Sequence, residues 1–334
     1  MKMRLIAAAL LSVSIVLAGC TVPGSSDKSA AKAGTIVADE SSDPGHIWAM
    51  TPIGRIDFTL TEPTEKLPPY DEAYDRAAEG AKFIGVSWNW QSFTRPAPMT
   101  IKRQAPSVTF VIDKLRYNLD EVMRRKASGD LPIDLSGTAW VAVADAPERL
   151  VEADLSIEVT YDGLTQIVEP RQPAGTTDTA ADALYLPPET LAKHGQTCGA
   201  ARPAKGWTLG TDNCRVEVMN VPYYEPVGWA SQGESWTVVT VRANPGELAH
   251  TRGYRQSITF ADEAPTATYR LDDAKPVKVI PAADDPQRKG IVGDTVVFEA
   301  DGTVYQDFTI DAEFRGEPGD DPAALRVTWS TTLG

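Results

Sequence analysis

Few side chains in this sequence are spaced for catalysis. The pair that comes nearest to a catalytic pattern is His194 and Cys198, which are four residues apart in the sequence. A thiolate nucleophile needs a neighbouring base such as histidine, so a free catalytic Cys198 is one interpretation of this pair. The segment Gly233–Thr237 lacks the second glycine of a nucleophile elbow, and Ser235 is therefore predicted to be structural.

Residues that bind metals or cofactors are equally scattered. His46, His194 and His250 have no partner ligand two or four positions away, as a zinc site would require. Several aspartates in turns could supply oxygen ligands to calcium, but none forms an EF-hand loop. Phosphate-binding and dinucleotide-binding fingerprints do not occur. We therefore predict no metal, no cofactor and no enzymatic activity.

Aromatic residues are the best candidates for binding. Trp207, Tyr223, Tyr224 and Trp229 fall in a stretch rich in glycine and proline. Exposed aromatic rings in such a loop could stack on sugar rings or pack against a protein partner. The alternative is that these four side chains fill a junction between domains or the base of a loop.

The first twenty residues differ from the rest of the chain. Lys2 and Arg4 precede a mostly apolar run over 5–17, and small residues follow it. This pattern is typical of an export signal, and the run is shorter than the roughly 20 residues of a membrane-spanning helix.

The end of this run, Leu17-Ala18-Gly19-Cys20, resembles the lipobox of bacterial lipoproteins. The resemblance implies that residues 1–19 are removed and that Cys20 becomes the lipid-modified first residue. It places the protein on the outer face of the cell membrane or in the periplasm. An ordinary secretory signal with an incidental cysteine is the alternative.

With Cys20 lipidated, two of the three cysteines remain, and in an exported protein they are expected to form a disulfide between Cys198 and Cys214. The formal net charge of −14 makes nucleic acid an improbable partner, because phosphate backbones repel an acidic surface. We expect membrane contact through the lipid anchor, and an envelope protein or glycan as a further partner.

Alternating apolar residues and 25 prolines with 25 glycines predict an all-β, turn-rich chain. A length of 334 residues suggests two domains, and short sequence matches recur in order along both halves. One match relates the hairpin turn Asp162-Gly163 to Asp301-Gly302. The pattern resembles that of the secreted immunoglobulin-like lipoproteins of actinobacteria, and this resemblance implies two tandem antiparallel β-sandwiches.

The predicted organisation is a signal peptide over 1–19 and a flexible tether over 20–47. Sandwich domains are expected over 48–182 and 212–334, with a linker over 183–211 that holds a short helix and the disulfide loop. Further short helices are expected over 70–80 and 118–129. The predicted function is a non-enzymatic binding module of the cell envelope. The alternatives are an envelope enzyme with a site between the domains near the disulfide, or a carrier of an apolar ligand.

Overall fold

The computed structural model describes residues 29–39, 47–67, 74–92, 104–125, 133–170, 179–185, 194–209, 213–246, 248–250, 264–282, 290–300, 306–316 and 324–333. Within these ranges the chain is mostly β, which confirms the predicted class. The helices there are short: α1 (Asp120–Met123), η1 (Leu150–Glu152) and η2 (Ala180–Tyr185). No helix in the described part is long and apolar enough to cross a membrane. Leu17, Ala18, Gly19, Cys20 and His46 lie outside the described residues.

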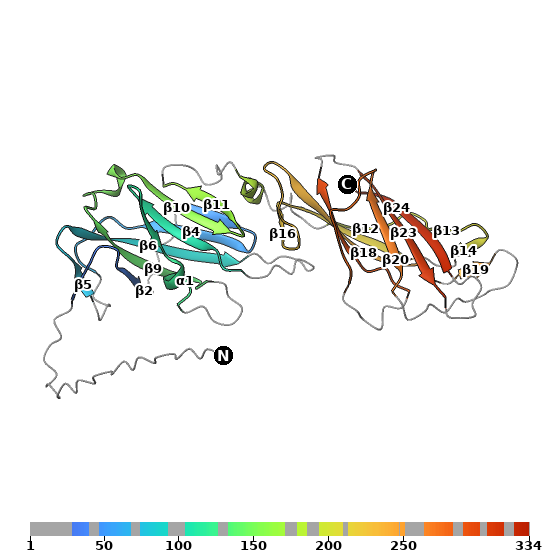
Figure 1. Cartoon of the computed structure of the whole chain (residues 1–334), viewed down its shortest axis with the longest axis horizontal. Helices are drawn as coiled ribbons and strands as arrows, with labels where there is room; N and C mark the ends of the chain where they lie inside the picture. Colours follow the sequence, from blue (N-terminus) through green and yellow to red (C-terminus); the bar gives the residue numbers. More distant parts are fainter. Residues whose placement is uncertain are drawn as a thin grey trace, which may run out of the picture.

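Figure 1 shows two halves of the chain lying side by side, with the strands up to β11 in one half and those from β12 onward in the other. The first half has two main antiparallel sheets. The five-stranded sheet has the order β2 (Ile36–Asp39), β9 (Ser136–Ala144), β6 (Ala81–Ser92), β4 (Gly54–Leu60), β3 (Ile47–Thr51). The four-stranded sheet has the order β11 (Leu164–Val168), β10 (Leu155–Tyr161), β7 (Ser107–Ile112), β8 (Leu115–Asn118).

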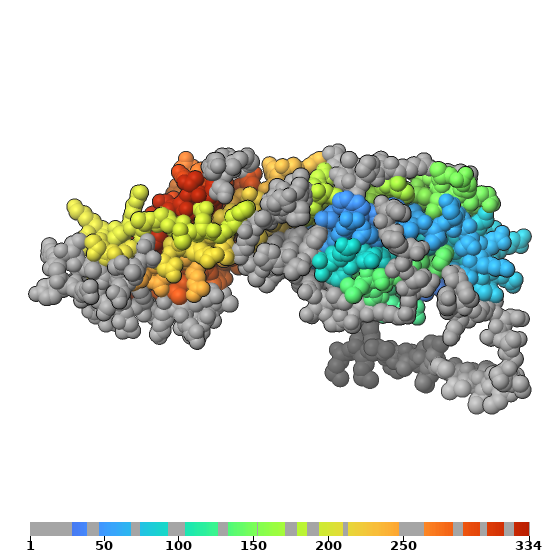
Figure 2. Space-filling view, turned by 180° about the vertical axis from the view of Figure 1, so that it is seen from behind, coloured from blue at the N-terminus to red at the C-terminus, as the bar shows by residue number. Residues whose placement is uncertain are grey.

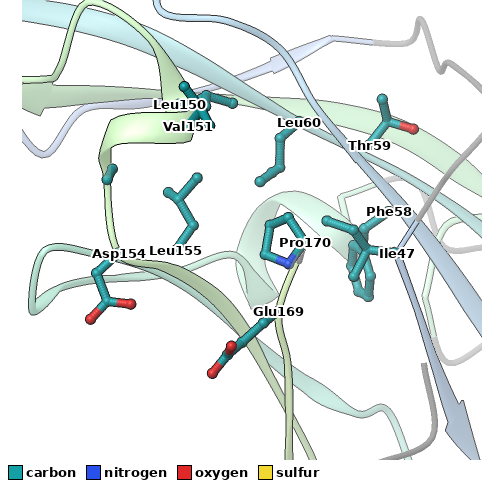
Figure 3. A pocket seen from close by; sticks show the side chains of 11 residues that line it. Ile47, Phe58, Thr59, Leu60, Leu150, Val151, Asp154, Leu155, Glu169 and Pro170 are labelled. Carbon is teal, nitrogen blue, oxygen red and sulfur yellow. The ribbon is translucent and has the colours of Figure 1, made fainter. Parts of the chain in front are cut away.

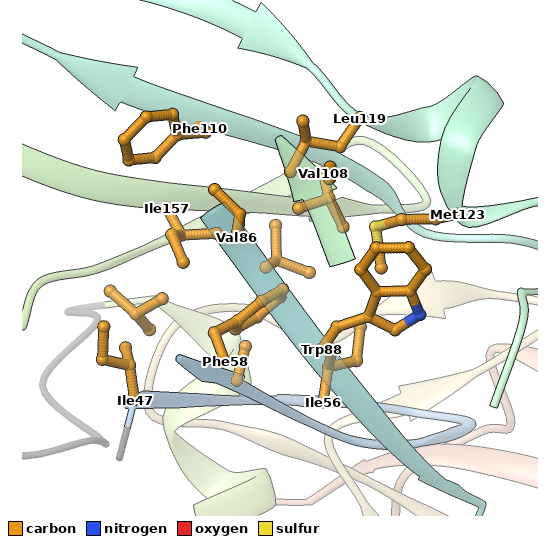
Figure 4. Packing of buried hydrophobic residues seen from close by; sticks show 14 of the residues in the cluster. Ile47, Ile56, Phe58, Val86, Trp88, Val108, Phe110, Leu119, Met123 and Ile157 are labelled. Carbon is orange, nitrogen blue, oxygen red and sulfur yellow. The ribbon is translucent and has the colours of Figure 1, made fainter. Parts of the chain in front are cut away.

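These two sheets pack face to face because their strands place apolar side chains on one face. Strands β7 and β10 bury every second residue, among them Phe110 and Ile157. These side chains share one buried cluster with Phe58 and Trp88 of the five-stranded sheet (Figure 4). Fully burying a side chain of this size stabilises the fold by about 1.5–3 kcal/mol. The core of the first half therefore lies between its two sheets.

The second half is built in the same way. Figure 2 shows it from behind, in yellow to red beside the blue-to-green first half. One sheet has the order β12 (His194–Thr197), β15 (Asn213–Val221), β18 (Ser235–Asn244), β22 (Thr295–Ala300), β21 (Lys278–Ile280). The other has the order β13 (Arg202–Pro203), β24 (Ala324–Leu333), β23 (Gln306–Arg315), β20 (Thr266–Leu271). Val216, Val239, Phe308 and Trp329 from the two sheets meet in a second buried cluster.

Three short strand pairs complete the described sheets. They are β1 (Ser29–Ala31) with β5 (Tyr74–Ala77), β14 (Trp207–Leu209) with β19 (Leu248–His250), and β16 (Tyr223–Tyr224) with β17 (Gly228–Trp229). The first pair is parallel and the other two are antiparallel.

The same order of connections recurs in the two halves. In the larger sheets β3, β4, β6 and β9 are neighbours in chain order, and so are β12, β15, β18 and β22. In the smaller sheets β7, β10 and β11 correspond to β20, β23 and β24. The edges differ, because β2 precedes β3 in the chain whereas β21 lies between β20 and β22.

Two aspartates occupy equivalent turns in the two halves and show which residues correspond to each other. Asp113 follows β7 with φ 45°, and its carboxylate accepts the backbone N–H of Asp154 at 3.0 Å. Asp272 follows β20 with φ 50°, and its carboxylate accepts the backbone N–H of Asp307 at 2.8 Å. Aspartate tolerates the left-handed conformation better than most residues, which suits it to both turns.

The match predicted between the two Asp-Gly turns is wrong. Asp162-Gly163 does form a two-residue hairpin between β10 and β11, with Tyr161 paired to Leu164. Asp301-Gly302 lies outside the described residues, and the strands before and after it, β22 and β23, belong to different sheets. The segment that corresponds to the first hairpin is therefore the connection between β23 and β24.

Several predicted local structures also differ from the observed ones. The tether predicted over 20–47 includes β1 and β2, and β2 is held by pairing with β9 about 100 residues later. The helix predicted over 70–80 is replaced by strand β5, whose Tyr74 and Ala77 pack against an apolar cluster on the outer face of the sheet. The short helix predicted in the linker was expected over 187–195, but His194 begins strand β12; residues 187–193 lie outside the described residues. The helix predicted over 118–129 is the single turn α1, and residues 126–129 of that prediction are not described.

Candidate ligand pocket and the junction beside it

A pocket of about 340 Å³ lies at one edge of the first sandwich. Its described lining residues come from β3, β4, the η1 turn, the start of β10 and the chain after β11: Ile47, Phe58, Thr59, Leu60, Leu150, Val151, Ala153, Asp154, Leu155, Glu169 and Pro170. In Figure 3 the apolar side chains surround the hollow, while the carboxylates of Asp154 and Glu169 both point to the same side, away from it. The arrangement is an apolar hollow with an acidic rim.

The pocket lies where the seam between β3 and β11 opens. Near the middle of β3, Gln166 of β11 donates its amide N–H to the carbonyl of Met50 at 2.7 Å. The hydroxyl of Tyr185 accepts the N–H of Met50 at 3.1 Å and donates to Gln166 at 2.8 Å. Gln166 is fully buried, so these bonds satisfy polar groups that burial would otherwise leave unpaired. They close the seam there, and it opens at the start of β3, between Ile47 and Pro170.

The wall formed by η1 is held by polar contacts to the backbone. The N–H of Leu150 donates to a carboxylate oxygen of Glu62 at 2.9 Å. Asp113 holds Asp154 from both sides, because its carboxylate accepts the N–H of Asp154 and its own N–H donates to the carbonyl of Asp154 at 3.0 Å. Val151 projects from this wall with 56% of its surface exposed. Val151 therefore adds exposed apolar surface to the lining of the pocket.

The four aromatic residues predicted to form a binding face do not form one. Tyr223 and Tyr224 are only 4% and 5% exposed. Tyr223 and Trp229 pack against the core of the first half, Tyr224 belongs to a cluster on the outer face of the β18 sheet, and Trp207 packs against the core of the second half. The prediction of a shared exposed platform is therefore wrong. For Tyr223 and Trp229 the alternative holds, because they fill the junction between the halves.

This junction is built by the short hairpin of β16 and β17. The ring of Tyr223 meets the ring of Tyr161 edge to face, with centroids 5.5 Å apart, and it also contacts Trp229 at 5.0 Å. The indole N–H of Trp229 donates to the carbonyl of Tyr161 at 2.9 Å. Burial, reinforced by a hydrogen bond to Asp162, raises the pKa of the Tyr223 hydroxyl. The hairpin thus attaches the second half to the end of β10, and Leu155 at the other end of that strand lines the pocket.

The predicted disulfide between Cys198 and Cys214 is present, with Cα atoms 5.3 Å apart. It excludes Cys198 as a free nucleophile in this state. Cys214 lies near the start of β15, whereas the junction follows the end of that strand, roughly 25–30 Å away at about 3.3 Å per residue. The disulfide and the junction therefore lie at opposite ends of β15.

Among the described residues, no three histidine, cysteine or acidic side chains are grouped so as to hold a metal ion. Comparison with known proteins gives no relative: no family model, no curated protein and no solved structure matches this chain. The pocket was not foreseen from the sequence. Its walls come from segments up to about 120 residues apart, and none of these segments carries a local motif.

Proposed function

We propose that this protein is an exported lipoprotein, anchored through Cys20, and that its two immunoglobulin-like sandwiches form a non-enzymatic binding module of the cell envelope. The observation that carries the binding role is the pocket beside Val151 and Leu155. Ligand sites are concave and mostly apolar, with a few polar groups that orient the ligand. This pocket has that composition, since its carboxylates lie at the rim.

The proposed location rests on the lipobox and on the cysteines. A disulfide within a folded sandwich indicates an oxidising environment outside the cytoplasm. Lipidation of Cys20 would hold the sandwiches at the membrane surface, since several acyl chains on one residue give stable anchoring.

The size of the pocket bears on the alternative function, which is that of a carrier of an apolar ligand. A volume of 340 Å³ equals that of about eleven water molecules. This is at the low end of the range for small-molecule sites and too small to enclose a lipid with two long chains. The pocket is therefore suited to recognising one short apolar group of a ligand.

Binding of the neutral fluorescent probe N-phenyl-1-naphthylamine tests this role. Val151→Ser removes apolar contact at the pocket, and Ile167→Ser is a matched control, because Ile167 is 53% exposed on β11 and does not line the pocket. We expect saturable binding by the wild type and about fivefold weaker binding by Val151→Ser, which corresponds to about 1 kcal/mol. The Ile167→Ser protein should bind like the wild type. Equal losses in both variants, or no saturable binding, would contradict the proposal.

A further inference from the structure

The charged residues that line the pocket are both acids. Asp154 and Glu169 are its only charged residues among those described, and their carboxylates lie on one side of the apolar hollow (Figure 3). Glu62, which accepts the N–H of Leu150, adds a third acid behind the same wall. Two arginines adjoin lining residues in sequence: the exposed Arg149 precedes Leu150 and does not line the pocket, and Arg171, which follows Pro170, lies outside the described residues.

The carboxylate of Asp154 is attached to a rigid part of the structure. Two hydrogen bonds between Asp113 and Asp154 hold the backbone of Asp154, while its side chain is exposed to solvent. The equivalent turn in the second half makes the same contacts between Asp272 and Asp307, so these bonds belong to the scaffold. The scaffold thus fixes the backbone of Asp154 and leaves its carboxylate at the rim of the pocket (Figure 3).

The closed part of the seam limits how a ligand enters. A peptide could bind a sandwich edge by adding a strand, which requires unpaired backbone groups on the edge strand. On β3 both the N–H and the carbonyl of Met50 are already bonded to Tyr185 and Gln166. A strand added along β3 could therefore not pair with Met50, and this favours a ligand that enters the pocket end-on, with its apolar group inside and its polar group at the rim.

We infer that the pocket binds a small amphiphile that has a short alkyl or aryl group and a cationic ammonium head. The apolar group fills the hollow between Leu60, Val151 and Leu155, and the ammonium lies beside the carboxylates of Asp154 and Glu169. An ammonium near two carboxylates gains attraction, which is modest because the carboxylates lie at a solvent-exposed rim and is strongest at low salt. An anionic head at the same place is repelled. This inference rests on the proposed binding function and adds the charge of the ligand to it.

Titration calorimetry with three ligands of equal chain length tests this inference: n-octylammonium, 1-octanol and octanoate, each as a monomer at neutral pH and low salt. The wild type should bind octylammonium about tenfold more tightly than octanoate, with octanol between them, which corresponds to about 1.4 kcal/mol. The variant Asp154→Asn with Glu169→Gln should bind the three ligands within twofold of one another while keeping its affinity for octanol.

A control variant separates local charge from net charge. Asp273→Asn with Glu299→Gln removes the same charge from two exposed positions of the second half, and it should keep the wild-type preference. If that control loses the preference as well, or if the wild type binds all three ligands equally, the inference about charge is overturned and the binding function stands. If the wild type binds none of the three, the binding function is overturned too.

Discussion

The indole of Trp229 donates a hydrogen bond across the junction to the carbonyl of Tyr161, at 2.9 Å. On the other side of the hairpin, the indole of Trp236 donates to the carbonyl of Gly228, also at 2.9 Å. Two successive tryptophans therefore connect the β18 sheet to the end of β10. Because Tyr223 packs against Trp229 and the core of the first half, the junction is fixed by side-chain contacts as well as by the chain itself.

Replacing Trp229 with phenylalanine should loosen this junction. The change removes the donor to Tyr161 but keeps an aromatic ring beside Tyr223, and a lost hydrogen bond of this kind costs about 0.5–1.5 kcal/mol. We expect the radius of gyration from small-angle X-ray scattering to rise while each half stays folded. Trp207→Phe, in the second half, is the control and should leave the radius unchanged. An unaltered radius in Trp229→Phe would show that the hydrogen bond does not hold the halves together.

Removing the disulfide should destabilise the second half. The bond joins residues 16 positions apart, and closing a loop of about that length contributes roughly 3 kcal/mol in the chain-entropy model. Replacing Cys198 and Cys214 together with serine should lower the denaturation midpoint of the second half by a corresponding amount. Urea unfolding followed by the fluorescence of Trp329, which is fully buried there, measures this effect. A midpoint equal to that of the oxidised wild type would refute the prediction.

Stability should depend on pH through Asp311 and Arg326. The guanidinium of Arg326 donates to the carboxylate of Asp311, with Nε and Oδ1 2.7 Å apart, and this hydrogen bond is the main reason why the pKa of Asp311 lies below its usual 3.8. A lowered folded pKa stabilises the fold above the unfolded pKa, and that stability is lost as the pH falls through the folded value.

For this solvent-exposed pair we expect a contribution of only about 0.2–1 kcal/mol. The free energy of unfolding of the wild type should exceed that of Asp311→Asn at pH 6, and the difference should shrink below pH 3.8. Urea titrations at several pH values measure it, with the exposed Asp273→Asn as the control. A difference that does not change down to pH 2 would count against this role for the ion pair.

Labelling with a fatty-acid analogue tests the anchor. Cells that express the wild type should incorporate the label into the protein, and Cys20→Ala should abolish incorporation because the modified thiol is absent. Cys198→Ser with Cys214→Ser is the control for the other two cysteines and should still be labelled. Label that persists in Cys20→Ala would contradict the lipoprotein assignment.

Sequence patterns predicted where strands lie. They were less successful in predicting which residues of the first half correspond to which residues of the second. Alternation identified β7 and β10, because each buries every second residue. By sequence alone, Tyr117–Asp120 is similar to Tyr269–Asp272, which would make Asp120 the counterpart of Asp272. The hydrogen bonds show instead that Asp113 is the equivalent residue. Alternating sequences match at many offsets, and the register is set by turn contacts that the sequence does not reveal.

Long-range contacts account for the other differences. The first strands of the chain looked like a tether because Ala31 and Val37 stand among small and polar residues, yet β2 gains its stability from β9. Tyr223 and Trp229 were predicted to bind a partner, but they pack at the junction against Tyr161, which lies about 60 residues earlier. The pocket likewise depends on how separate segments meet, which periodicity cannot predict.

The most direct test of the binding role is photoaffinity labelling in intact envelopes with a neutral alkyl diazirine of about eight carbons. If the pocket binds apolar groups, adducts should concentrate on the segment from Leu150 to Leu155, should be displaced by excess octanol, and should fall in Val151→Ser but not in Ile167→Ser. Adducts spread evenly over the protein, undiminished by octanol and equal in both variants, would contradict the account.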